Sequence, residues 1–289
     1  MRVRPGDTLA VDDVARIEIA WFSADLFPQH SGPFLRVALD APNLRWMHVF
    51  NAGVDHPVFA RFTARGVRLT TSAGASAIPI AHTVMMHLLA MCRGVRTYET
   101  NQRGRIWQSI ANVDMEGRTL AVIGLGAIGS EVARLAARFG MSVIGLRRTP
   151  APDDPCETWA PGRLPELLAV ADDVVLAAPL TDATHHIIGV AELAMMRAGV
   201  HMVNIGRGEL VDEPALIAAL RSGHVGAAAL DVFAAEPLPV DSPLWDMPNV
   251  TVTPHAAGGT ELSHRRAADM FVENLRNFWR GAPLRNEVF

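Results

Sequence analysis

The chain has 289 residues, of which 49% are hydrophobic, and its formal net charge is −4 at pH 7. This length suits one large domain or two of ordinary size, with enough apolar residues to form buried cores. The slightly acidic balance argues against nucleic-acid binding, which needs a basic face. No apolar stretch approaches the roughly 18 residues of a membrane span. The N-terminus has no apolar run after its arginines, so it does not resemble a secretory signal, and we expect a cytoplasmic protein.

All 26 basic residues are arginine, and the absence of lysine excludes several kinds of enzyme. Schiff-base chemistry needs a lysine amine, and P-loop and protein-kinase sites need a lysine that reaches the phosphates. The chain also lacks the HExxH motif of zinc proteases and the GxSxG motif of serine hydrolases. Two cysteines, Cys92 and Cys156, are too few for a disulfide framework or a four-cysteine zinc site, and we expect no metal.

The N-terminal part of the chain predicts a small α/β domain. Strands are expected at Ile17–Trp21 and Trp46–Phe50, and a long helical run follows from roughly Ala77 to Gln102. A C-terminal helix is expected from about Glu261 to Arg280 and would complete the same domain. We therefore predict a discontinuous domain formed by residues 1–91 with 268–289.

The central part, residues 92–267, alternates short β-branched runs with amphipathic segments, which predicts a doubly wound domain with a parallel sheet. Thr119–Ile123 is continuously apolar, as is typical of a strand buried on both faces. Asp212 is the expected N-cap of a helix, and the proline-rich stretch Pro150–Pro165 is expected to be an irregular surface excursion. Further strands are expected at 141–144, 174–177, 201–204, 228–230 and 250–252, with helices around 164–171, 189–197 and 213–221.

A glycine-rich motif follows the strand expected at Thr119–Ile123. It is Gly124-Leu125-Gly126-Ala127-Ile128-Gly129, and a helical pattern follows it until Gly140. In this strand–turn–helix context the glycines permit a tight turn, close approach of the backbone to a pyrophosphate, and close helix–strand packing. The helix N-terminus offers unpaired N–H groups to phosphate. The motif therefore predicts a Rossmann-type dinucleotide-binding domain, and a glycine turn without a ligand is the alternative.

The end of the next strand indicates which dinucleotide is bound. An NAD-selective site has an Asp or Glu about 20 residues beyond the glycines, which accepts hydrogen bonds from the ribose. This chain has Leu146-Arg147-Arg148-Thr149 there, and two guanidiniums could hold a 2′-phosphate. We expect NADP(H) to be preferred, with NAD(H) possible. The alternative is a solvated pair of surface arginines.

Three later segments carry chemically active side chains at the ends of expected strands. They contain Arg207, Glu236 and His255, in that order. Because ligands of doubly wound sheets bind beyond the carboxyl ends of the strands, we expect these side chains to converge on one crevice. The alternatives are a loop salt bridge for Arg207, a solvated charge for Glu236 and a capping role for His255.

These ordered motifs resemble those of the D-isomer-specific 2-hydroxyacid dehydrogenases, from about Leu44 to the C-terminus. The resemblance implies that Arg207 binds the substrate's carboxylate and carbonyl oxygen, that His255 is the acid/base, and that Glu236 pairs with His255 and orients its ring. A 2-keto acid needs an anion anchor, a polarised carbonyl and a proton source, and these groups with a nicotinamide supply them without a metal. The resemblance rests on Asn51–Asp55, Gly124–Gly129, Ala178–Thr181, Asn204–Gly208, Asp231–Pro237 and Pro254-His255.

The resemblance also implies which residues bind the two ligands. The backbone N–H groups of Ala52, Gly53 and Val54 would hold the substrate carboxylate from a smaller, flavodoxin-like substrate domain. Asp231 would hold the nicotinamide carboxamide, and Pro179 would line the cofactor cleft. The implied cofactor-binding set is Gly124, Gly126, Ala127, Ile128, Gly129, Arg147, Arg148, Thr149, Ala178, Pro179, Thr184, Ile205, Gly206, Arg207, Asp231, His255 and Gly258.

The expected activity is the NADPH-dependent reduction of a small 2-keto acid, such as glyoxylate, hydroxypyruvate or a bulkier analogue, to a D-2-hydroxy acid. Formate, phosphite and phosphoglycerate enzymes of the same family are alternatives. A cofactor-sensing corepressor with little turnover is the alternative from another class of protein.

Two features concern the rest of the molecule. The family's substrate domain usually has a strand and a helix ahead of the segment that Ile17–Trp21 resembles, so we expect a trimmed N-terminal domain.

Family members usually form two-fold dimers, and the apolar run from Ala77 to Gln102 also favours a homodimer. Trp107 lies where the family often has a tryptophan near the dimer contact, and a plain core tryptophan is the alternative.

Overall fold

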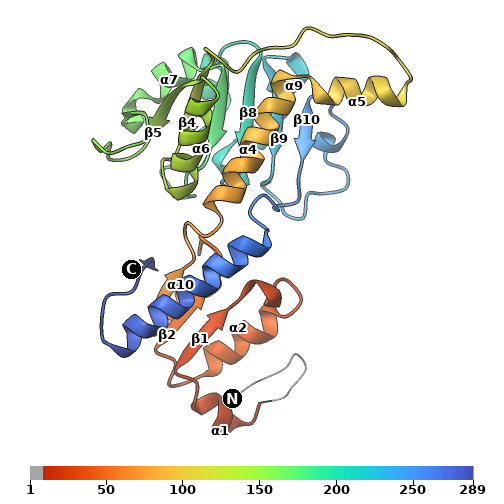
Figure 1. The fold of residues 1–289 in the computed structure, drawn as a ribbon. Helices are drawn as coiled ribbons and strands as arrows, with labels where there is room; N and C mark the ends of the chain where they lie inside the picture. Colours follow the sequence, from red (N-terminus) through yellow and green to blue (C-terminus); the bar gives the residue numbers. More distant parts are fainter. Residues whose placement is uncertain (1–8, 289) are drawn as a thin grey trace. The chain divides into compact units, whose positions relative to one another are not determined.

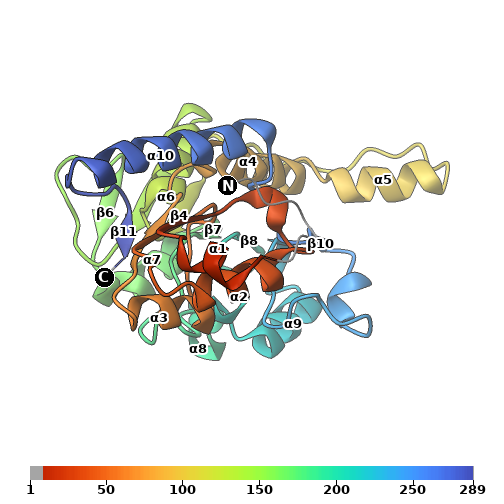
Figure 2. The ribbon, with the colours of Figure 1, turned by 90° about the horizontal axis from the view of Figure 1, so that it is seen from below.

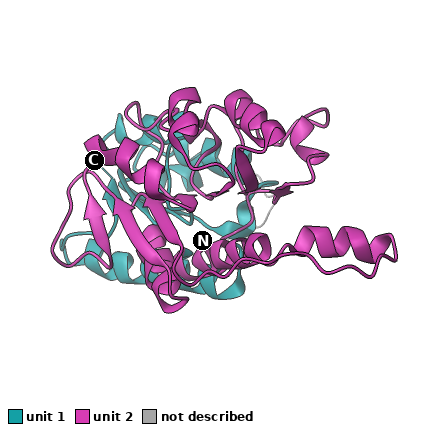
Figure 3. Ribbon diagram, turned by 90° about the horizontal axis from the view of Figure 1, so that it is seen from above, with its two compact units in different colours: residues 1–76, 259–289 teal, residues 77–258 magenta. Residues whose placement is uncertain are grey.

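The computed structural model describes residues 9–288, which form two compact units (Figures 1 and 3). Unit 1 comprises the chain up to Ser76 and from Gly259 onward, and unit 2 comprises Ala77–Gly258. Each unit has its own sheet and its own apolar core. The predicted fold class, a doubly wound domain with a second and smaller α/β domain, is confirmed.

Unit 2 is built on a seven-stranded sheet in which all neighbouring strands are parallel, in the order β10-β9-β8-β7-β4-β5-β6. Its strands are β4 (Thr119–Ile123), β5 (Ser142–Leu146), β6 (Glu157–Trp159), β7 (Asp173–Leu176), β8 (Val200–Asn204), β9 (Val225–Leu230) and β10 (Val250–Val252). Its helices are α4 (Ala77–Cys92), α5 (Val95–Arg103), α6 (Ala127–Arg138), α7 (Leu164–Val170), α8 (Val190–Met195) and α9 (Glu213–Ser222), with short 3-10 turns at 161–163, 208–210 and 243–245.

Helices cover both faces of this sheet (Figures 1 and 2). α4 and α6 pack against one face, where Leu88 and Val132 belong to one buried cluster. α7, α8 and α9 cover the other face, where Leu168 and Leu216 belong to a second. Burial from both sides explains why Leu120–Ile123 of β4 is continuously apolar and at most 1% exposed. Asp212 is the N-cap of α9, as predicted, because its carboxylate accepts from the backbone N–H of Ala215 at 3.1 Å.

The sequence predicted one continuous helical run from Ala77 to Gln102, but the structure has two helices there, so the prediction of a single run was wrong. α4 ends at Cys92, Gly94 adopts a left-handed φ of 57°, and α5 then runs in a direction that differs by 64°. This left-handed conformation favours glycine, because other residues adopt a positive φ only at a cost. Among the described residues no single helix has the length and apolar composition of a membrane span, and only this bent pair passes that test jointly.

α5 and the segment that follows it extend from the body of unit 2, as Figures 1 and 3 show. We call residues 95–113 the arm. The arm returns to the end of α4, where the backbone N–H of Val113 donates to the carbonyl of Cys92 at 2.9 Å. Several of its apolar side chains are exposed, and Trp107 is fully so. The alternative of a core position for Trp107 is therefore wrong.

The proline-rich stretch Pro150–Pro165 is not wholly irregular, since it contains the edge strand β6. Residues 157–159 of β6 pair in parallel with residues 144–146 of β5. The strand lacks the length and the apolar alternation that would reveal it in the sequence, and its pairing is with a distant segment.

Unit 1 has a four-stranded sheet in the order β1-β2-β3-β11, with β11 antiparallel to β3. Trp46 of β2 stacks on Phe271 and Phe278 on one face, while Met47 and Val49 face the opposite core. Its strands are β1 (Ile19–Phe22), β2 (Trp46–Val49), β3 (Arg68–Thr71) and β11 (Glu287–Val288), and its helices are α1 (Val11–Ala15), α2 (Ser31–Asp40), α3 (Pro57–Thr63) and α10 (Glu261–Trp279), with a 3-10 turn at 24–26.

The units divide at 76/77 and 258/259, whereas the sequence placed the divisions at 91/92 and 267/268. The first division comes earlier because α4 packs against α6 and therefore belongs to unit 2. The second comes earlier because Phe271 and Phe278 of α10 pack on Trp46 of the unit 1 sheet. Ahead of β1, the described residues form the short helix α1, and residues 1–8 of the predicted domain lie outside the described part.

His48 is a fully buried histidine in β2 of unit 1. Its Nδ1 lies 2.7 Å from Oγ1 of Thr70, and its Nε2 lies 3.0 Å from Oγ of Ser72. Burial lowers the pKa of His48 to about 4, against a smaller opposing effect of a backbone hydrogen bond with Ala267. The folded protein therefore holds this ring in its neutral form at neutral pH.

We expect this histidine to make the protein less stable in mild acid. The unfolded chain protonates His48 near its ordinary value of 6.5, and the folded chain does so only near 4, so stability is lost as the pH falls between these values. The loss between pH 7 and pH 5 should be roughly 2 kcal/mol. Urea unfolding at both pH values should show this loss shrinking in His48→Gln but not in His185→Gln, a change at an exposed histidine. An equal loss in His48→Gln would contradict the prediction.

Candidate active site

The glycine loop joins β4 to α6 at the carboxyl end of a central strand. Gly124 has a φ of 101°, and a β-carbon there would lie 2.5 Å from the backbone nitrogen of Ala178. A β-carbon at Gly129 would lie 1.9 Å from the carbonyl oxygen of Gly124. Gly126, by contrast, faces open space, and no side chain among the described residues caps the N-terminus of α6 that it precedes. The loop thus leaves room and free amides at the start of a 12-residue helix, which fits a pyrophosphate.

Close backbone packing continues along the same edge of the sheet. A β-carbon at Gly206 would lie 3.0 Å from the carbonyl oxygen of Ala178, and one at Gly208 would lie 1.9 Å from the carbonyl carbon of Phe233. Arg207 lies between these two glycines, so its backbone is held between the segments that follow β7 and β9. The structure therefore places the Arg207 turn between Ala178, which also packs against Gly124 of the glycine loop, and the segment that begins at Phe233.

Asn204 fixes the turn that carries Arg207, a role that the sequence analysis missed. This asparagine is 2% exposed, its Nδ2 donates to the carbonyl of Arg207 at 2.9 Å, and its Oδ1 accepts from the N–H of Gly206 at 3.1 Å. The guanidinium of Arg207 also donates to the carbonyl of Gly206 at 2.7 Å. An asparagine that ends a strand just before a glycine is a signal for such a turn.

His255 and Glu236 form the predicted pair. Nδ1 of His255 lies 2.9 Å from Oε2 of Glu236, and Oε1 of Glu236 accepts from the N–H of Phe233 at 3.0 Å. The backbone therefore fixes the carboxylate, and the carboxylate orients the imidazole. About half of the His255 side chain is exposed. With Nδ1 engaged, Nε2 is the ring atom left for proton exchange with a ligand.

The loop that carries His255 is held by Asp231. His255 adopts a left-handed φ of 50°, which costs a non-glycine residue about 1–2 kcal/mol. Its N–H donates to the carbonyl of Asp231 at 2.8 Å, while the carboxylate of Asp231 accepts from the Thr253 hydroxyl at 2.5 Å and from the N–H groups of Ala256 and Ala257 at 2.9 and 3.0 Å. Asp231 was expected to contact the cofactor alone, and its residue type did not indicate this positioning contact.

The remaining residues of unit 2 that were predicted to bind the cofactor follow its strands at the same edge. Ala178, Pro179 and Thr184 follow β7, and the hydroxyl of Thr184 donates to the carbonyl of Pro179 at 2.6 Å. Arg147 follows β5 and forms an ion pair with Asp154, whereas the neighbouring Arg148 is exposed. Also in this set are Ala127 and Ile128 in the first turn of α6, Thr149 after β5, Ile205 after β8 and Gly258 after β10.

The predicted substrate loop, Ala52–Val54, follows β2 in unit 1. Nδ2 of Asn51 donates to the carbonyl of Gly53 at 2.9 Å, and the carbonyl of Asn51 accepts from the N–H of Ser72 at 3.1 Å. Within residues 9–288, none of the N–H groups of Ala52, Gly53 and Val54 donates a hydrogen bond. Three unpaired amides in a fixed loop fit an anionic ligand. The role of Asn51 in shaping this loop was not predicted.

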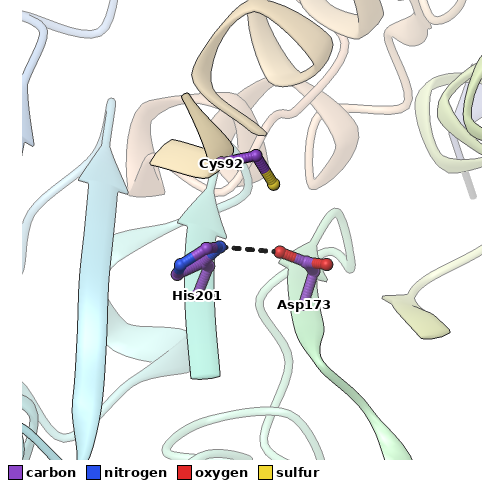
Figure 4. Close-up of side chains that lie close together, drawn as sticks. All are labelled: Cys92, Asp173 and His201. Atoms are coloured by element: carbon purple, nitrogen blue, oxygen red, sulfur yellow. Dashed lines mark hydrogen bonds and ion pairs between the residues drawn. The ribbon is translucent and has the colours of Figure 1, made fainter. Parts of the chain in front are cut away.

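A separate cluster at the opposite end of the unit 2 sheet joins Cys92, Asp173 and His201, whose potential metal-ligand atoms lie within 4.8 Å of one another (Figure 4). Nδ1 of His201 lies 2.9 Å from Oδ1 of Asp173, and Arg118 contacts both carboxylate oxygens of Asp173 at 2.7 and 3.1 Å.

Burial opposes ionisation of Asp173, but its hydrogen bonds with His201 and Arg118 outweigh that effect and lower its pKa. Burial also raises the pKa of the Cys92 thiol, which favours the protonated form. The guanidinium of Arg118 thus supplies the positive charge that a bound cation would bring. These contacts favour an ion-pair network over a metal centre.

Comparison with known proteins agrees with the fold. Residues 85–257 match the model of the D-isomer specific 2-hydroxyacid dehydrogenase NAD-binding domain. Glyoxylate/hydroxypyruvate reductase B of Yersinia pestis is 36% identical over 256 residues, which are 86% of this chain and 78% of the relative.

Two solved structures extend the comparison. A D-isomer specific 2-hydroxyacid dehydrogenase of Xanthobacter autotrophicus, in complex with NADPH and MES, has 36% identity and a TM-score of 0.84, over 99% of this chain and 88% of that one. An NADPH-dependent glyoxylate/hydroxypyruvate reductase of Sinorhizobium meliloti, in complex with NADP and sulfate, has 31% identity and a TM-score of 0.81, over 94% of this chain and 85% of that one.

The fold and the glycine loop define a nicotinamide-dinucleotide-dependent oxidoreductase. The chain belongs to the D-isomer specific 2-hydroxyacid dehydrogenase family, as its motifs predicted. Enzymes of this family act on a CH–OH group, and a nicotinamide dinucleotide is the cofactor class that the glycine loop fits.

Two glycine substitutions should separate cofactor binding from folding. Gly129→Ala should lose roughly 1–3 kcal/mol of stability, because the added carbon would overlap the Gly124 carbonyl. Gly126→Ala should keep its melting temperature but bind NADPH about tenfold more weakly, because the methyl group would fill space left for phosphate. Thermal melting and NADPH fluorescence titration measure both effects. Unchanged NADPH affinity in a folded Gly126→Ala variant would remove this loop from the cofactor site.

Proposed function

We propose that the protein reduces a small 2-keto acid to the D-2-hydroxy acid and prefers NADPH as the hydride donor. The hydrogen bond between His255 Nδ1 and Glu236 Oε2 carries this proposal, because it presents an oriented acid/base at the edge of the sheet where the cofactor loop also lies. The glyoxylate and hydroxypyruvate reductases among the relatives support a small substrate such as glyoxylate or hydroxypyruvate.

Two side chains of unit 2 bind and protonate the substrate in this proposal. The planar guanidinium of Arg207 binds the carboxylate and the carbonyl oxygen, since its donors match that geometry. His255, in its protonated form, donates the proton on Nε2 to the carbonyl oxygen, and Glu236 stabilises the imidazolium through Nδ1. The bound nicotinamide supplies the hydride that the carbonyl carbon receives. Asn204 and Asp231 position these groups through the backbone.

The amides of Ala52, Gly53 and Val54 are proposed as a further anchor for the substrate carboxylate. Their support is the set of three unpaired N–H groups in a loop that Asn51 holds. Backbone amides suit a carboxylate of any small 2-keto acid, because they contact only the group that all such substrates share.

Loss of the imidazole should abolish most turnover and spare cofactor binding. His255→Gln should lower kcat on the preferred keto acid by roughly 10²- to 10⁴-fold, the usual contribution of a general acid. Glu236→Gln should cause a smaller loss, because the amide oxygen still accepts from Nδ1. NADPH oxidation with a panel of keto acids measures both, and NADPH titration provides the binding control. Absence of turnover by the wild type on every keto acid would favour a cofactor-sensing role instead.

The cofactor preference is testable in the wild-type protein. Because two arginines, and no carboxylate, directly follow the last residue of β5, kcat/KM should be roughly tenfold or more higher with NADPH than with NADH. Steady-state rates at saturating keto acid, with each cofactor varied in turn, give this ratio. A clear preference for NADH would refute this part of the proposal.

A homodimer that forms through the arm is the proposed assembly. Exposed apolar side chains are concentrated on residues 95–113, and a fully exposed tryptophan is a typical anchor of an interface. The exposed residues are Val95, Tyr98, Ile106, Trp107 and Val113.

Removal of the tryptophan should weaken this dimer. Trp107→Ser should raise the dimer dissociation constant by roughly 30-fold or more, as expected for an aromatic anchor at an interface. Val240→Ser is the matched control, because Val240 is equally exposed but lies outside the arm. Sedimentation equilibrium over a concentration series measures both variants. A monomeric wild-type protein, or equal behaviour of the two variants, would contradict an arm-mediated dimer.

A further inference from the structure

The carboxyl-terminal segment of unit 1 is fixed by contacts with a strand and with a helix. β11 pairs with β3, and Glu287 lies opposite Thr70. On α10, the fully buried Asn274 holds the backbone of Arg285 from both sides. Its Nδ2 donates to the carbonyl of Arg285 at 2.9 Å, and its Oδ1 accepts from the N–H of Arg285 at 2.8 Å. These contacts on either side of Asn286 fix the position of that residue.

Asn286 binds the backbone at the end of β3. Its φ is 56°, a left-handed conformation that asparagine adopts more readily than most residues. Its Nδ2 donates to the carbonyl of Thr71 at 3.2 Å and to the carbonyl of Ala73 at 3.0 Å. The N–H of Thr71 donates to the carbonyl of Asn286 at 3.0 Å. One side chain therefore fixes the backbone on both sides of Ser72.

Ser72 is 2% exposed and holds the segment that leads into the predicted substrate loop. Its Oγ donates to the carbonyl of Val49, the last residue of β2, at 2.9 Å, and its N–H donates to the carbonyl of Asn51 at 3.1 Å. Because the one hydroxyl proton goes to Val49, Oγ accepts from Nε2 of the neutral His48 at 3.0 Å. Ser72 thus joins the end of β2 to the residue directly ahead of Ala52.

Asn51 alone gives the substrate loop only partial support. Its Nδ2 donates to the carbonyl of Gly53, but its Oδ1 is buried and has no hydrogen-bond partner among residues 9–288. Backbone amides bind an anion well when they converge on it, and a loop that is fixed before binding loses less conformational freedom. The arrangement of the three unpaired amides therefore depends on the contacts that Ser72 makes with Val49 and Asn51.

We propose that Asn286 is a positioning residue for the substrate carboxylate. Asn286 holds Ser72, and Ser72 holds the loop that presents the three unpaired amides. The proposal rests on the 2-keto acid reduction proposed above, because it assigns these amides to that substrate. It adds to the substrate site a segment that contains none of the residues predicted to touch the substrate or the cofactor.

Asn286→Gly tests this contact. Glycine accepts the same positive φ, so the change removes both donated hydrogen bonds without straining the backbone. KM for the preferred keto acid should rise roughly three- to tenfold, while kcat stays within about twofold, because Arg207 and His255 of unit 2 are unchanged. The NADPH dissociation constant, measured by fluorescence titration, should not change.

Oxamate binding gives a second measurement that needs no turnover. Oxamate has the carboxylate and the neighbouring carbonyl of a 2-keto acid, but it is an amide and resists reduction. Its dissociation constant from the enzyme–NADPH complex should rise by about the same three- to tenfold in Asn286→Gly. A wild type that binds oxamate but reduces no keto acid would refute the proposed reaction, and the oxamate titration would still decide the role of Asn286.

Glu287→Gln is the matched control, because Glu287 follows Asn286 directly and its carboxylate pairs with Arg68 of β3 at 2.6 and 2.7 Å. Both variants should lower the melting temperature by about 2–4 °C, but only Asn286→Gly should raise KM for the keto acid. Asn286→Asp also accepts a positive φ and, when ionised, cannot donate, so it should raise KM at least as much. An equal rise in Glu287→Gln would show a merely structural role and overturn the proposal.

A double-variant cycle tests whether Asn286 acts through the substrate loop. Asn51→Ala removes the contact with Gly53 inside the loop and should also raise KM. In the double variant with Asn286→Gly, the rise should be smaller than the product of the two single rises, because both changes loosen the same loop. Rises that multiply would overturn the proposal. Unchanged KM and oxamate affinity in Asn286→Gly would overturn it and leave the proposed reaction intact, whereas a wild type that neither reduces a keto acid nor binds oxamate would refute both.

Discussion

Backbone-to-backbone packing at the carboxyl edge of the unit 2 sheet is the constraint on which the whole site depends. Parallel strands deliver their following loops to one edge. Glycines at 124, 206 and 208 then allow the loops that follow β4, β7, β8 and β9 to approach more closely than most side chains would permit. The glycine loop, the Ala178 segment, the Arg207 turn and the segment before Glu236 are therefore parts of one packing arrangement.

Three carboxylates of unit 2 fix the positions of other side chains or loops. Asp231 holds the loop that carries His255, Glu236 holds the imidazole, and Asp154 holds Arg147. Each accepts at least one backbone N–H, so its own position is fixed by the fold before it acts on a second group. A carboxylate that is bound by the backbone and also contacts a second group can fix that group in a defined orientation, even on an exposed loop.

The sequence predicted the parts of the fold that depend on local patterns. The apolar run of β4, the glycine motif and the Asp212 cap each lie within a few residues and need no knowledge of distant contacts. The break at Gly94 was missed because a single glycine does not by itself end a helical pattern, and β6 was missed because it is recognised only by its pairing with β5. The His255–Glu236 pair was predicted. The Asp231 contacts that support it were not, because Asp231 binds backbone N–H groups, which every residue except proline carries.

The left-handed backbone of His255 has a consequence for attempts to redesign this site. An engineer who replaces the histidine by another acid or base changes a conformational preference as well as a side chain. Asparagine, aspartate and glycine accept a positive φ more readily than most residues, and β-branched residues tolerate it worst. The backbone conformation at position 255 therefore restricts which residues can replace the histidine, whatever acid or base chemistry their side chains offer.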